Sequence, residues 1–96
     1  MSSKIGEHLG ICSSLNELYK SKNKDYGDSF GKARELIPNY TLGKLYDKFN
    51  RYMTLSLQED RQVQDETIED TLLDLANYCI MEVVERRMED DKGTDN

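Results

Sequence analysis

Apolar residues recur at intervals of three or four through most of this chain, and that spacing restricts it to helices. In the first stretch Ile5, Leu9, Leu15 and Leu18 follow the pattern. Because an α-helix has about 3.6 residues per turn, residues with this spacing share one face. No segment of any length alternates apolar and polar residues as a half-buried strand does. We therefore predict an all-α fold, a small helical bundle.

The pattern divides into three main helices and one short helix. The polar segment 23–28 is expected to interrupt it, because Asn, Asp and Gly favour turns. Asp28 or Ser29 is expected to cap the short helix, and Pro38 to end it. Thr41 is the expected N-cap of the next helix. The expected helices span about 4–22, 29–37, 41–57 and 65–89.

The apolar stripes of the later helices indicate that the bundle is completed by a partner. The third expected helix has a stripe that we expect to be buried: Leu42, Leu45, Tyr46, Phe49 and Met53. The apolar arc of the last helix covers nearly half its circumference, which is wide for a helix that packs on one side only. One edge of that arc is Ile68, Leu72, Leu75, Cys79 and Val83, and the other is Leu73, Ile80 and Val84. We expect a homo-oligomer, most simply a dimer, with a compact monomer as the alternative.

A length of 96 residues allows one domain, which we place at residues 1–89. The tail, 90–96, is too polar to pack and is expected to be disordered. No apolar run is long enough to cross a membrane, and no secretory signal is visible at the N-terminus. Cys12 and Cys79 do not make a disulfide framework and are expected to be small core residues. We expect a cytoplasmic protein with no membrane partner.

Charge is distributed unevenly along the chain, whose net charge is −6. Residues 1–55 hold nine Lys and Arg against six Asp and Glu, whereas residues 56–96 hold four against thirteen. A basic half folded against an acidic half fits a site for an anionic ligand with a counter-charge nearby. It equally fits two halves that attract each other as packed helices. Duplex nucleic acid is disfavoured as a partner, because the pI is near 4.7 and no basic stripe is present.

A polar stripe borders the apolar arc of the last helix. Asp70, Asp74 and Asn77 fall close together at about 100° per residue, with Glu66 one turn earlier. Two carboxylates one turn apart repel each other unless a cation lies between them or a basic side chain reaches across. Mg²⁺ suits such oxygen ligands, so Asp70 and Asp74 are the candidate metal ligands. The alternative is an acidic edge paired with Lys48 or Arg51 of the preceding helix.

Two further polar clusters carry candidate nucleotide-binding residues. The first lies at a helix end: Lys22, Asn23, Asp25, Tyr26 and Asp28. Its lysine adds positive charge and its tyrosine ring offers a stacking surface for a base, although Asn and Asp here also suit a C-cap and a turn. The second cluster lies in mid-helix, where Lys48 and Arg51 are natural phosphate donors and Asn50 has no propensity reason to occur. A lone His8 without Cys or His at ligand spacing makes zinc unexpected.

Three ordered motifs resemble a known family. The segments are KNKDYGDSF at 22–30, YDKFNR at 46–51 and ETIEDTLLDLANYCIM at 66–81. They are similar to the elements of a small all-α domain common in bacteriophages, the first nucleotide modification associated domain. The resemblance implies a phage or prophage origin, so that the cytoplasm would be that of the host, and a role around nucleotides. The chain is also distantly similar to the MazG-type all-α nucleotide pyrophosphohydrolases, but it lacks their EExxE helix.

Three functions are consistent with these features. The first is a nucleotide-binding protein of phage nucleotide metabolism or DNA-base modification. In it Lys22, Lys48 and Arg51 hold phosphates, Tyr26 stacks the base, and Asp70, Asp74 and the nucleotide-binding candidate Asn77 hold Mg²⁺ or a ribose. The second is an oligomeric sponge that sequesters nucleotide-derived immune signals in defence evasion and needs no metal. The third is a MazG-like pyrophosphohydrolase, in which a carboxylate activates water. In each case the partner is a nucleotide or a molecule derived from one.

Overall fold

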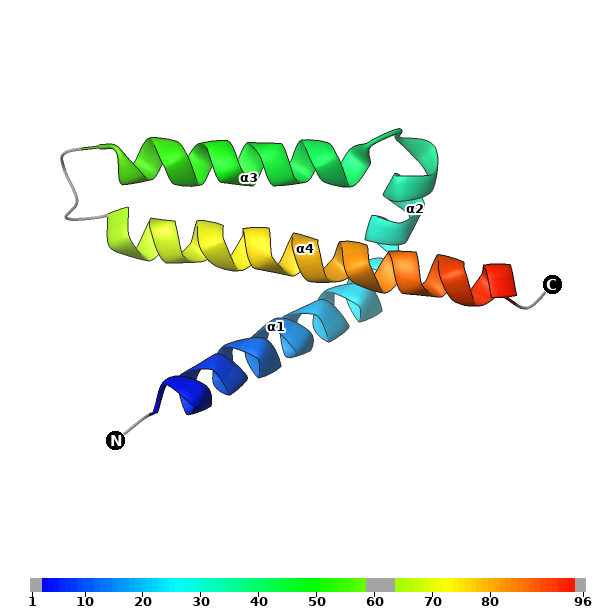
Figure 1. Cartoon of the computed structure of the whole chain (residues 1–96), viewed down its shortest axis with the longest axis horizontal. Helices are drawn as coiled ribbons and strands as arrows, with labels where there is room; N and C mark the ends of the chain where they lie inside the picture. The colour runs from blue at the N-terminus through cyan, green and yellow to red at the C-terminus, as the bar shows by residue number, and fades with distance from the viewer. Residues whose placement is uncertain (1–2, 59–63, 95–96) are drawn as a thin grey trace. The chain divides into compact units, whose positions relative to one another are not determined.

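The protein is all-α, as the sequence predicts. A computed structural model describes residues 3–58 and 64–94, which contain helices and no strand. The helices are α1 (Lys4–Tyr26), α2 (Ser29–Leu36), α3 (Tyr40–Ser56) and α4 (Gln64–Thr94), shown in Figure 1. No helix in the described ranges combines the length and the hydropathy that crossing a bilayer requires.

The chain divides into two compact units, Met1–Ala33 and Arg34–Asn96, with the boundary inside α2. The first unit holds α1 and the start of α2, and the second holds α3 and α4. The prediction of one domain over residues 1–89 stays a prediction, because a compact group of helices need not fold independently of its neighbour.

Helix α1 is one turn longer than its apolar pattern indicates. The Ser3 hydroxyl caps it by accepting a hydrogen bond from the Gly6 amide at 3.0 Å. At the other end, α1 runs through Tyr26 and ends at Gly27, whose φ of 66° and ψ of −161° are open almost only to glycine. The turn expected over 23–28 therefore begins at Gly27, because the glycine rather than the polar residues before it ends the helix.

Capping explains how α2 and α3 begin. The Asp28 carboxylate accepts a hydrogen bond from the Gly31 amide at 3.2 Å, which confirms Asp28 as a cap of α2. The expected cap of α3, Thr41, is wrong. Asn39 occupies the N-cap position in the left-handed conformation, with φ 59°, and Thr41 is buried within the first turn. Asn tolerates that conformation better than most residues, which explains the earlier start of α3.

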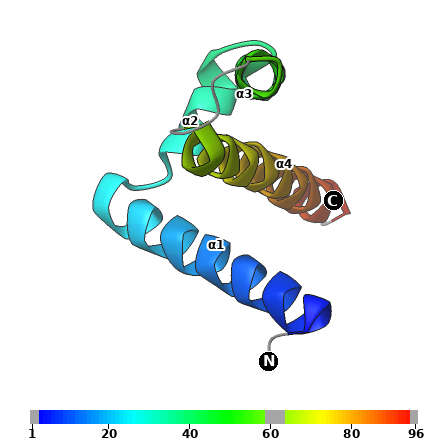
Figure 2. The same cartoon turned by 90° about the vertical axis from the view of Figure 1, so that its left-hand side faces the viewer.

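Helices α3 and α4 form an antiparallel hairpin, as Figures 1 and 2 show. The less exposed residues of α3 include Thr41, Leu45, Lys48 and Tyr52, which lie along one edge of the helix. On α4 the corresponding edge is Thr71, Leu75, Tyr78 and Glu82. The stripe expected to be buried on α3 is therefore wrong in all but Leu45, because Leu42, Tyr46, Phe49 and Met53 are exposed.

Few apolar side chains of the described chain are fully buried. Leu15 and Phe30 are the buried apolar residues of the described chain, and both belong to the first unit. In the described part of the second unit the buried residues are Thr41 and Thr71. The two cysteines, expected in the core, are free and exposed, because each lies on a helix face that nothing described here covers.

Helix α4 extends beyond its expected end at Glu89 and includes residues 90–94. This corrects the helix boundary. Asp90 and Asp91 continue the helix after Glu89, whose carboxylate is held by an ion pair with Arg34 at 2.6 Å. The disorder expected of the tail stays a prediction, and residues 95–96 lie outside the described residues.

Candidate functional site

The two motif helices of the second unit meet at one ion pair. Lys48 Nζ on α3 lies 3.1 Å from Asp74 Oδ2 on α4, and both side chains remain partly open to solvent. Asp74 is thus paired with a lysine of the preceding helix, as one of the two interpretations of the acidic stripe requires. An exposed pair of this kind adds little stability, at most about 1 kcal/mol, so its lysine can change partners at low cost.

The predicted metal ligands are two exposed carboxylates of α4. Asp70 and Asp74 lie one turn apart on α4 and are both exposed. No group of three or more His, Cys, Asp or Glu side chains gathers in the described ranges at a spacing that would hold a metal ion. Asp74 is already paired with Lys48, so a cation at these carboxylates would compete with that lysine, and Mg²⁺ at Asp70 and Asp74 stays a prediction. The side chain of Glu66 lies outside the described residues.

The mid-helix motif of α3 separates into two sides. Lys48 and Arg51 are three residues apart and lie on the same side of the helix. Arg51 is exposed, and no ion pair joins it to another described side chain. Asn50 is also exposed, but two residues from Lys48 on a helix means nearly the opposite side. The structure therefore pairs Lys48 with Asp74 and places Arg51 on the same side of α3 as Lys48. Asn77 is half-buried farther along α4, and Asn50 lies apart.

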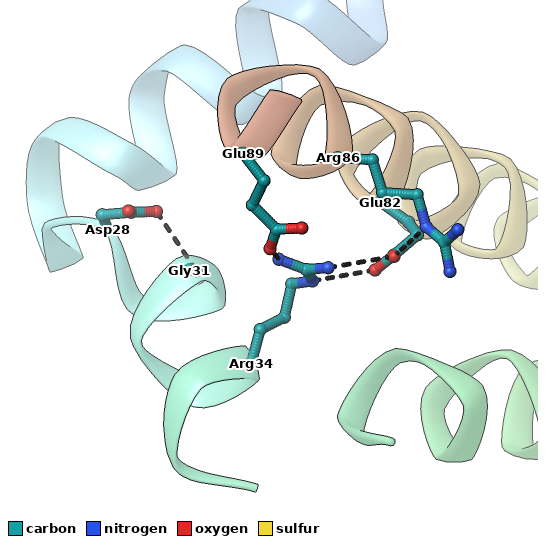
Figure 3. Close-up of polar contacts among 6 residues, drawn as sticks. All are labelled: Asp28, Gly31, Arg34, Glu82, Arg86 and Glu89. Carbon is teal, nitrogen blue, oxygen red and sulfur yellow. Dashed lines mark hydrogen bonds and ion pairs between the residues drawn. The ribbon is translucent and has the colours of Figure 1, made fainter. Parts of the chain in front are cut away.

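The first unit carries the other predicted cluster at the end of α1. Lys22, Asn23, Asp25 and Tyr26 are exposed in the last turns of the helix, and the Tyr26 side chain is 72% exposed. Lys22 and Tyr26 are four residues apart, so they share a side of α1. Asp28 is already committed to capping α2 (Figure 3). This motif thus combines structural residues, Gly27 and Asp28, with side chains that are open to a ligand.

A charged cluster that sequence reasoning missed joins α2 to α4. The Arg34 guanidinium contacts the Glu82 carboxylate with both Nε and Nη2, at 2.9 and 3.1 Å, and Glu89 through Nη1 at 2.6 Å. Arg86 Nε donates to Glu82 Oε2 at 2.6 Å, the oxygen that also accepts from Arg34 Nη2 (Figure 3). Spacing along α4 reveals the Glu82–Arg86 pair, but nothing local indicates a partner 48 residues earlier.

Hydrogen bonding dominates the electrostatics of this cluster. Burial alone would raise the pKa of the Glu82 carboxyl, but hydrogen bonds from Arg34 and Arg86 outweigh it and lower the pKa to about 2. Hydrogen bonds to Glu82 and Glu89 likewise raise the pKa of the Arg34 guanidinium. Glu82 is therefore ionised at neutral pH, and the cluster is a bidentate clasp between two helices.

A pocket of about 360 Å³ lies beside this clasp. Its walls include Tyr40, Thr41 and Leu45 of α3. The buried Thr41 hydroxyl has no hydrogen bond of good geometry within the described chain, yet it lies close enough to Glu82 to lower the pKa of that carboxyl. We therefore assign the Thr41 hydroxyl a role in stabilising the ionised Glu82 carboxylate, beside the two arginines that pair with it.

Fold and motifs together define a class: a small all-α protein with exposed cationic side chains on two motif helices. The model of one family, described as nucleotide modification associated domain 1, matches residues 22–85. The chain belongs to that family. No curated protein and no solved structure matches the chain. The likeness to MazG-type enzymes stays a prediction.

Proposed function

We propose that this chain is a nucleotide-binding protein that holds phosphate groups with Lys48 and Arg51 of α3. The supporting observation is that both side chains lie on one side of α3, partly or fully exposed, within the segment that matches a family associated with nucleotide modification. Arginine binds phosphate oxygens as a planar fork and lysine as a point charge, so the two complement each other. The class of function is nucleotide metabolism or DNA-base modification.

In the absence of a ligand, the Lys48–Asp74 ion pair occupies the proposed phosphate site. Without an anion, Asp74 neutralises Lys48 at 3.1 Å. A phosphate carries more charge than a carboxylate and accepts more hydrogen bonds, so it competes for the same ammonium group. Binding then releases Asp74. The proposal needs no metal, and Mg²⁺ at Asp70 and Asp74 stays a separate prediction to be tested by binding with and without EDTA.

Direct binding measurement tests the phosphate site. Purified protein is titrated by calorimetry with nucleoside mono-, di- and triphosphates, and the solutions are then analysed for cleavage by mass spectrometry. We expect Lys48→Ala and Arg51→Ala each to weaken binding about 10- to 100-fold, the usual range for charge-assisted hydrogen bonds. Arg87→Ala removes an exposed arginine of α4 and should leave the affinity unchanged.

The outcomes separate the functional classes. Binding without cleavage supports the proposal and also fits a protein that sequesters nucleotides. Release of pyrophosphate makes the protein an enzyme and favours the MazG-like alternative. Unchanged affinity in both the Lys48 and Arg51 variants removes them from the site.

The end of α1 supplies a second, independent set of proposed contacts. Tyr26 offers an exposed ring, and Lys22 lies on the same side of the helix. Stacking a base on an aromatic side chain is worth about 1–3 kcal/mol, so Tyr26→Ala should weaken nucleotide binding about 5- to 150-fold. Tyr26→Phe is the matched control, because it retains the ring and should retain the affinity. Equal losses in both variants would contradict stacking.

A further inference from the structure

The second unit presents an apolar face that no described part of that unit covers. On α3 and at its C-cap, five exposed residues follow the helical repeat: Leu42, Tyr46, Phe49, Met53 and Leu57. At 1.5 Å per residue they extend over about 22 Å, or four turns. This set is called the α3 stripe. No Lys, Arg, Asp or Glu is a member of it.

Helix α4 contributes to the same face. The α3 stripe lies roughly 100° around its helix from the edge that faces α4, and Leu72, Cys79 and Val83 lie roughly 90° from the edge of α4 that faces α3. Both displacements have the same rotational sense. Because the two helices are antiparallel (Figure 1), equal rotations bring both sets to the same side of the hairpin. Arg51, Asp70 and Asp74 lie on the other side.

The second unit has few fully buried side chains, so exposure of this apolar face to water is costly. Within the described residues of the second unit, the fully buried side chains are two threonines, and apolar residues of both helices such as Leu45 and Leu75 are only half-buried. Burial of apolar surface is the main favourable term in folding. Phe49 is 54% exposed and Leu42 is 66% exposed, so a partner that covers them would add apolar burial to that of the hairpin.

We infer that this face seats the same face of a second copy of the chain, with α3 antiparallel to the partner's α3. Four of the five members of the α3 stripe form two pairs about the point between residues 49 and 50, and Phe49 lies beside that point. In an antiparallel two-fold pair centred there, Leu42 of each copy lies level with Leu57 of the other, Tyr46 lies level with Met53, and Phe49 lies beside its own copy. The α3 stripe has no charged member, so it also meets its own copy without repulsion. The result is a four-helix bundle built from two hairpins.

Asn50 takes a defined place in this arrangement. It flanks the α3 stripe beside the two-fold axis and points away from Lys48. Positions that flank an antiparallel helix pair at its midpoint meet their own counterparts. An amide side chain can donate and accept at once, so two such groups bind each other across the axis. A polar residue at such a place fixes register, which gives Asn50 a role in the interface rather than at the phosphate site.

Analytical ultracentrifugation over a range of concentrations tests the face. The native chain should have twice the 11.2 kDa mass of one chain. Phe49→Lys places a charge opposite its own copy and should raise the dissociation constant about 100-fold or more, because the loss occurs twice. Leu36→Lys is the control, since Leu36 is 81% exposed and lies outside the face. A monomer at every concentration overturns the inference. A dimer indifferent to Phe49→Lys also overturns it.

A cross-linking experiment tests the position of the axis and does not depend on disruptive variants. In a chain with both native cysteines replaced by serine, Asn50→Cys should form a disulfide-linked dimer under mild oxidation. Arg51→Cys, one residue away on the opposite side of the hairpin, should stay monomeric on a denaturing gel. Equal cross-linking of both variants, or no cross-linking of Asn50→Cys, would contradict a two-fold axis beside residue 50. Nucleotide binding is not a readout here, so the two proposals fail independently.

Discussion

Individual residues set the boundaries of the helices more than the pattern around them. Gly27 ends α1 because its backbone occupies a region that side chains exclude, and Asn39 starts α3 from the left-handed conformation. The Asp28 carboxylate folds over Gly31, where a Cβ atom would collide with it. Two of the conspicuous residues in the KNKDYGDSF motif, the glycine and the second aspartate, thus have structural roles, and the exposed Lys22 and Tyr26 are left for a ligand.

Substitution of glycine separates backbone conformation from packing. Gly27→Ala should destabilise the fold by about 1–3 kcal/mol, because alanine is strained at this φ and ψ. Gly10→Ala is the matched change inside α1, where an added Cβ meets no atom within 4 Å. It should stabilise the chain by about 0.5–1 kcal/mol, since glycine weakens a helix interior. Urea unfolding measures both changes, and equal effects would show that Gly27 is not conformationally required.

At the scale of helices, periodicity predicted the elements but not the faces that they use. The four helices could be predicted because their signals are local: the apolar spacing lies within each segment, and Pro38 marks the end of the short helix. Which part of an apolar arc meets α4 depends on the other helix. The stripe predicted from the sequence shares only Leu45 with the less exposed edge of α3, and the prediction missed Tyr52. For the same reason Arg34 was missed, because its partners lie 48 and 55 residues away.

The clasp between α2 and α4 should make stability depend on pH. The pKa of Glu82 is about 2 in the folded protein and 4.5 ordinarily. Its stabilisation is therefore complete above about pH 4.5 and is lost as the pH falls towards 2. Glu82→Gln should lower the melting temperature at pH 7 and flatten its decline between pH 4.5 and 2. Glu69→Gln, an exposed change on α4, is the control. A parallel decline in Glu82→Gln would contradict the assignment.

For the whole molecule, the uneven charge has at least one structural use. The ion pairs of Arg34 with Glu82 and Glu89, and of Lys48 with Asp74, each join the basic half of the sequence to the acidic half. This supports the simpler of the two interpretations of the charge pattern. Arg51 lies outside these pairs, so the cationic surface proposed for phosphate is smaller than the net charge of the first half indicates.

The two free cysteines turn the chain into its own reporter of association. Cys79 lies on the apolar face of α4, whereas Cys12 lies in α1, 3.9 Å from His8. Alkylation of a thiol requires access, so assembly should slow modification of Cys79 as protein concentration rises and leave Cys12 unchanged. The ratio of the two labelling rates, read from peptide masses, then follows the population of free chains. Within each molecule Cys79 is the probe of association, and Cys12 is the reference thiol that corrects the labelling rate for reagent concentration.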